Sequence, residues 1–73
     1  MKREDIEFLK GKETEIQVPH LFLDRPYHYY GVIVEITDEK VTLEQRKYGK
    51  RQGVIDIAIS DIICIKSRNW EVS

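Results

Sequence analysis

Alternating hydrophobic and polar residues mark most of this chain as β-strand. The clearest segment is residues 13–18, in which Thr14 and Ile16 lie on one side and Glu15 lies on the other. A period of two is typical of a strand with one face buried and one face in solvent. Four further segments show the same alternation and are also predicted to be strands: about residues 28–37, 40–47, 53–59 and 62–66.

The first ten residues follow a different pattern. Ile6 and Leu9 are three residues apart in a charged segment, which places them on one face of a helix. Gly11 then provides a plausible C-terminal stop. We predict one short helix over about residues 2–10, which is too short to be stable unless it packs on the strands.

Glycine and tyrosine residues mark the start of the second predicted strand. Gly31 lies inside an apolar run, where a residue without a side chain usually marks a bulge or a sharp bend. Just before it, Tyr27, Tyr29 and Tyr30 surround His28. Two interpretations stay open for this tyrosine cluster: half-exposed packing on the strand, or a platform on which nucleic-acid bases stack.

Residues 45–53 contain the one run of positive charge. Its cations flank Tyr48 and Gly49, and the glycines of this segment suit a reversal between two strands. A solvated hairpin end is one interpretation; the other is a basic finger that contacts phosphates while Tyr48 stacks on a base. The residues of this candidate site are Arg46, Lys47, Tyr48, Lys50 and Arg51.

The last predicted strand is apolar on both faces. Ile63 and Ile65 point one way, and Ile62 and Cys64 point the other. Because a small chain has little of its own to cover such a strand, either the N-terminal helix or a neighbouring subunit must cover one face. We therefore expect a homo-oligomer. Asp56 lies among isoleucines, and an ionised carboxylate there needs a partner across a subunit boundary or direct contact with solvent.

Composition narrows the class of protein. The chain has 73 residues, so we expect a single domain over residues 1–73. Its 12 Lys and Arg against 13 Asp and Glu argue against a strongly basic nucleic-acid binder, although a local patch can still act. Neither a membrane span nor a signal peptide is evident, which favours a cytoplasmic protein. We expect no metal, cofactor or enzymatic activity, since no nucleophile–base pair, phosphate loop or metal-ligand spacing is found.

Three segments narrow the fold further: FLKGKETEIQV, YYGVIVEITDEKVTL and IAISDIICI. Together they resemble the Sm/LSm family, which includes the archaeal Sm-like proteins and bacterial Hfq. The fold class expected is thus all-β with one short N-terminal helix, a small, strongly bent, five-stranded SH3-like or Sm-like barrel. The resemblance covers residues 6–66. It implies a ring of six or seven subunits, closed by pairing of the fourth strand with the fifth strand of the next subunit.

The same resemblance implies that single-stranded, uridine-rich RNA binds at the rim of a central pore. The matching positions lie in the turn after the second strand and in the break before the last strand: Lys40, Thr42, Ser60 and Asp61. This chain departs from the family at these positions, because the stacking group near Lys40 and the pore arginine are missing. Asp61 also carries a charge that repels phosphate.

Two functions from different classes follow from these patterns. The first is an oligomeric Sm-like RNA-binding protein that contacts RNA at the pore turns and the basic hairpin. The alternative is an SH3-like-barrel scaffold or protein-interaction module without nucleic acid, since a fold does not fix a function. Steep salt dependence of RNA affinity would favour the first.

Overall fold

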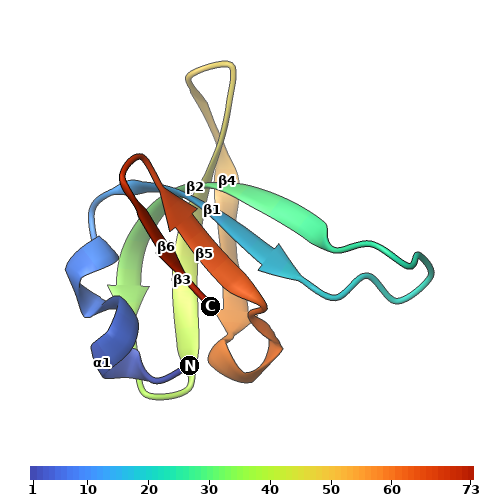
Figure 1. Cartoon of the computed structure of the whole chain (residues 1–73). Helices are drawn as coiled ribbons and strands as arrows, with labels where there is room; N and C mark the ends of the chain where they lie inside the picture. The colour runs from blue at the N-terminus through green and yellow to red at the C-terminus, as the bar shows by residue number, and fades with distance from the viewer.

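The computed structural model describes all 73 residues and is mostly β-structure (Figure 1). One antiparallel sheet contains six strands in the order β4-β3-β2-β1-β5-β6. Their bounds are β1 Glu13–Val18, β2 Tyr27–Ile36, β3 Lys40–Lys47, β4 Lys50–Ala58, β5 Cys64–Ser67 and β6 Trp70–Val72. The sheet is strongly bent, but β4 and β6 do not pair with each other, so it is not closed. No helix in the chain has the length and apolar character that crossing a membrane requires.

The N-terminal helix is shorter than predicted. α1 covers Arg3–Ile6, and a 3-10 turn over Glu7–Leu9 completes the segment. Ile6 and Leu9 are fully buried, which is the shared apolar face that their spacing indicates. A bond from the backbone N–H of Gly11 to the carbonyl of Ile33, at 2.7 Å, fixes the end of this segment to β2.

A register shift divides β2 into two halves. The pairing of β2 with β3 slips between Ile33 and Glu35, and Val34, which is 41% exposed, lies at the slip. Ile33 and Ile36 are instead both buried. The uninterrupted alternation expected after Gly31 is therefore wrong, because an extra residue in one strand moves the following side chains to the opposite face.

Gly31 has a different role from the bulge that its position suggests. It is buried between β2 and β3, opposite Gln45. A Cβ atom at this position would lie 2.1 Å from the backbone oxygen of Glu44. Gly31 thus allows a close approach of two backbones, and the register shift follows three residues later.

The last part of the chain also differs from expectation. A sixth strand, β6, pairs with the outer edge of β5, so the predicted count of five strands is too low. Ile62 and Cys64 are 9% and 5% exposed within the single chain, whereas Ile63 is 47% exposed. The single chain therefore covers Ile62 and Cys64 itself, and these two residues give no reason to expect a neighbouring subunit. The regular strand predicted over residues 62–66 is wrong at its start, because Ile62 belongs to the turn before β5.

The core lies inside the bend of the sheet. Apolar side chains from every strand except β6 meet beneath the helical segment, and Val72 of β6 packs against them. The largest buried members are Ile6, Leu9, Ile16, Ile33, Leu43, Ile65 and Val41. Two hairpins extend away from this core (Figure 1): the β3–β4 hairpin and the β1–β2 hairpin with its loop over residues 19–26.

Candidate nucleic-acid interface

The end of the β3–β4 hairpin, residues 46–51, is here called the hairpin tip. Tyr48 and Gly49 have φ angles of 54° and 76°. Positive φ at both central residues is what a two-residue type I′ turn requires, and Asn or Gly is favoured there. A tyrosine in this conformation is unusual. Its side chain is 92% exposed, so it packs on nothing in the core.

The four cations of the hairpin tip face each other in pairs. Arg46 lies opposite Arg51, and Lys47 lies opposite Lys50. Like charges directly opposite on neighbouring strands destabilise a hairpin. Glu44 relieves the first pair, with a carboxylate oxygen 2.6 Å from Arg46 and the other 3.7 Å from Arg51.

The second pair, Lys47 and Lys50, has no carboxylate within ion-pair distance. The Nζ atom of Lys47 instead lies 5.7 Å from the centroid of the Tyr48 ring, in a cation–π contact. Of the four cations of the hairpin tip, the ammonium groups of Lys47 and Lys50 therefore remain free to meet an anion.

The tyrosine cluster of β2 divides between two faces of the sheet. Tyr29 is half-buried against the core, with the ring of Tyr27 4.7 Å from its own. His28 and Tyr30 point to the outer face, where their rings stack at 6.5 Å. The packing interpretation is confirmed for Tyr29, which lies against the core, whereas Tyr30, at 57% exposure, presents its ring to solvent and its role as a stacking platform stays a prediction.

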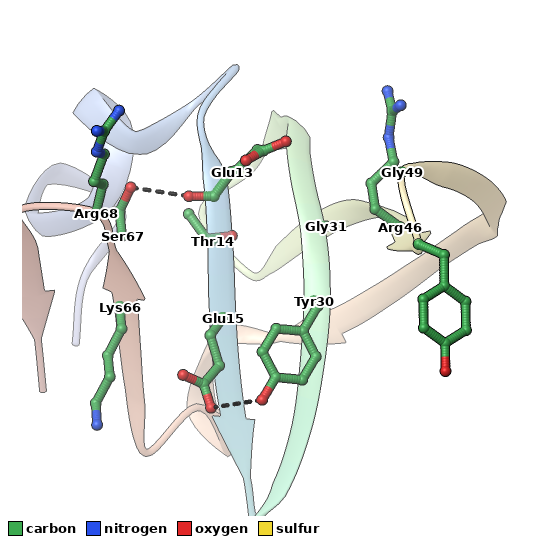
Figure 2. Close-up of a pocket in the computed structure, with 11 residues that line it drawn as sticks. Glu13, Thr14, Glu15, Tyr30, Gly31, Arg46, Gly49, Lys66, Ser67 and Arg68 are labelled. Atoms are coloured by element: carbon green, nitrogen blue, oxygen red, sulfur yellow. Dashed lines mark hydrogen bonds between the residues drawn. The ribbon is translucent and has the colours of Figure 1, made fainter.

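An open depression of about 670 Å³ joins this outer face to the hairpin tip (Figure 2). Lys66 of β5, Glu15 of β1 and Tyr30 of β2 are directly opposite one another across the three strands. Glu15 accepts hydrogen bonds from His28 Nδ1 and, at 3.4 Å, from the Tyr30 hydroxyl. The remaining lining residues are Glu13, Thr14, Gly31, Arg46, Tyr48, Gly49, Ser67 and Arg68.

A second depression of about 580 Å³ lies on the other side of Tyr30, between β2 and the hairpin tip. Tyr30, Arg46 and Tyr48 line both depressions. These three side chains therefore connect the outer face of β2 with the hairpin tip.

The turn over residues 37–40 and the 3-10 turn over residues 59–61 form the opposite end of β3, here called the turn end. The backbone N–H of Ile59 bonds the carbonyl of Glu39 at 2.9 Å, so the two turns are adjacent. The structure therefore brings Lys40 and Thr42 near Ser60 and Asp61.

Asp56 holds the one cation of the turn end, Lys40, and the hydroxyl of the nearby Thr42. Its carboxylate accepts a hydrogen bond from Thr42 Oγ1 at 2.7 Å and one from Lys40 Nζ at 3.1 Å. These bonds, from Thr42 first and then Lys40, lower the pKa of Asp56. The partner of Asp56 that the sequence left open thus lies within the same chain.

The two groups of predicted RNA contacts are far apart. Lys40 and Lys47 begin and end β3, so roughly 23 Å of extended strand separates the turn end from the hairpin tip. The structure does not unite the nine predicted residues in one site. It adds residues that the sequence analysis did not include as candidates, namely Glu13, Glu15, Lys66 and Arg68.

Cys64 offers no reactive group beside these surfaces. Burial raises the pKa of its thiol, so the protonated form prevails at neutral pH.

Comparisons with protein-family models, with curated proteins and with solved structures found no match to this chain.

Proposed function

We propose that this protein binds single-stranded RNA along the hairpin tip and the adjacent outer face of β2. Stacking of bases on Tyr48 and Tyr30 would supply sequence-tolerant affinity, and Lys47 and Lys50 would contact the phosphates. The proposal rests on one observation above all, the exposed tyrosine in a left-handed conformation between two unpaired lysines.

The conformation of Tyr48 is the reason to assign it a ligand. A non-glycine residue at positive φ costs on the order of 1 kcal/mol or more. Asn or Gly would form the same turn at lower cost, and the exposed ring gains nothing from the core. A contact with a stacked base accounts for a side chain that the fold itself does not use.

The turn end has a smaller part in this proposal than the resemblance to Sm/LSm proteins implies. Lys40 is held by Asp56, and Asp38, Glu39 and Asp61 add negative charge around it. A phosphate there would meet more carboxylates than free cations.

The Sm-like barrel and the homo-oligomeric ring of six or seven subunits also belong to the proposal. The bent sheet with its N-terminal helix supports the barrel class. A ring contact through β5, however, requires that β6 move aside, because β6 occupies the outer edge of β5. The free edges of β4 and β6 provide an alternative contact. The mass of the protein in solution tests both routes.

The experiment for the RNA-binding proposal is the substitution Tyr48→Asn. It should raise the free energy of unfolding by about 1 kcal/mol, because Asn tolerates positive φ. RNA affinity should fall about tenfold, since a stacked base is lost. Tyr48→Phe is the matched control and should retain affinity. Undiminished affinity in Tyr48→Asn, measured by fluorescence anisotropy, would refute the role of Tyr48.

One observation favours the second candidate function, a protein-interaction module. Leu21 and Phe22, in the loop between β1 and β2, are 90% and 87% exposed. Adjacent apolar side chains on a projecting loop are typical of a contact with an apolar pocket on a partner. Affinity for RNA that is absent even at low salt would leave this candidate as the stronger one.

A further inference from the structure

The order of side chains across the outer face indicates which RNA base would bind there. Lys66, Glu15 and Tyr30 form a row across β5, β1 and β2 (Figure 2), with neighbouring strands about 4.8 Å apart. Arg46 of β3 lines the same depression on the far side of Tyr30. The ring of Tyr30 therefore lies on the strand next to that of Glu15, and β3, which leads into the hairpin tip, is the strand beyond it.

The carboxylate side of Tyr30 can only accept hydrogen bonds. Oε1 of Glu15 accepts from His28 and Tyr30, whereas Oε2 has no partner in the chain. A carboxylate offers about four acceptor positions, so positions remain for a ligand. Glu13, also on the lining of the depression, makes no side-chain hydrogen bond either.

The bases differ in what they present to such an acceptor. The Watson–Crick edge of guanine has two adjacent donors, the N1–H group and the 2-amino group, which match the two oxygens of a carboxylate. Uracil has a single N3–H donor between two carbonyl acceptors, and those acceptors are repelled by the carboxylate. A base stacked on Tyr30 with this edge toward Glu15 directs its sugar and phosphate the opposite way, toward Arg46 and Lys47.

We propose that the depression beside Tyr30 selects guanosine over uridine, with Glu15 reading the base and Tyr30 stacking on it. This inference rests on the proposed RNA binding and deepens it. Hydrogen bonding of Glu15 to His28 holds the carboxylate in place beside the ring. Lys66 lies directly opposite Glu15 on β5.

The test compares labelled RNAs of about seven nucleotides, a length within the site sizes of single-strand binders. One is all uridine, one has a central guanosine, and one has a central inosine, which lacks the 2-amino group. We expect the guanosine RNA to bind about tenfold more tightly than the all-uridine RNA, with inosine between them. Fluorescence anisotropy measures all three affinities.

Two variants assign the preference to Glu15. Glu15→Gln should bring the ratio of guanosine-RNA affinity to all-uridine-RNA affinity close to one, because the amide replaces one of the two acceptor oxygens with a donor. The matched control is Glu39→Gln, an exposed glutamate at the turn end, which should leave the preference unchanged.

The outcomes separate this inference from the proposed function. Equal affinity of the wild-type protein for the uridine and guanosine RNAs would overturn the guanosine inference and leave RNA binding intact. A guanosine preference that persists in Glu15→Gln would overturn the role of Glu15. Binding of none of the RNAs at about 50 mM salt would overturn both the proposed function and this inference.

Discussion

The hairpin tip and the turn end carry similar numbers of charged residues but use them differently. At the turn end, Lys40 is paired with Asp56, and Arg3 of α1 contacts both Glu7 and Asp38. At the hairpin tip, like charges stand opposite one another. The cation of the turn end is thus paired within the chain, whereas two cations of the hairpin tip are not.

The difference shows that the cations available to a ligand are those left after ion pairs within the chain are subtracted. Arg46 and Arg51 share Glu44, whose side chain is only 19% exposed, whereas Lys47 and Lys50 have no such partner. Opposed like charges cost folding energy, and two ammonium groups that remain free can attract an anion. We expect the hairpin tip, not the turn end, to respond to an added polyanion.

The largest effect is expected at Gly31, which fixes the base of the β3–β4 hairpin against β2. Gly31→Ala should lower the free energy of unfolding by about 3 kcal/mol, since its Cβ cannot coexist with the backbone of Glu44. Urea denaturation measures the change. Gly11→Ala is the control: its φ is 84° but no atom lies within 4 Å of the added Cβ, so about 1 kcal/mol is expected. Equal losses in the two variants would contradict the close approach.

A second prediction compares the lysines of the two regions directly. Replacing Lys47 and Lys50 together with Ser should weaken RNA binding about tenfold and reduce the slope of log affinity against log salt by about 1.4. Lys40→Ser should change affinity less than about twofold, because Lys40 is already paired with Asp56. Anisotropy titrations at several salt concentrations measure both. A larger loss in Lys40→Ser would place the RNA at the turn end.

The smallest effect concerns the pKa of Asp56, which the hydrogen bond from Thr42 lowers most. Thr42→Val should raise this pKa toward its ordinary value, and Thr42→Ser should keep it low. A carboxyl whose pKa is lower in the folded state stabilises the protein at neutral pH, and this contribution is lost as the pH falls through the folded pKa. Thr42→Val should therefore reduce the acid sensitivity of stability. NMR titration of the Asp56 carboxyl carbon measures the pKa, and an unchanged value in Thr42→Val would contradict the assigned cause.

Local patterns in the sequence were sufficient for the parts of the fold that depend on one strand at a time. The alternation at Thr14 and Ile16 predicts a strand over the residues that form β1, and Ile6 and Leu9 predict a docked helical face. Ile36 shows where this approach ends. It faces the core, as Ile33 does, because the pairing with β3 slips between them, and the residues of β2 do not reveal that slip on their own.

The candidate site could be predicted only where its residues are neighbours in the sequence. The hairpin tip is one continuous segment, and its charge was evident. The row of Lys66, Glu15 and Tyr30 requires knowledge that β1 lies between β2 and β5, and the parts of the row are separated by up to fifty-one positions. The pairing of Asp56 with Lys40 likewise depends on the register of β3 against β4.

The measurement that tests the central claim most directly is a titration of single-stranded RNA against the wild-type protein and a variant in which Arg46, Lys47, Lys50 and Arg51 are all Ser. The account predicts that the wild-type protein binds at low salt, that its affinity falls steeply as salt rises, and that the variant does not bind. Equal affinity of the two proteins would contradict it.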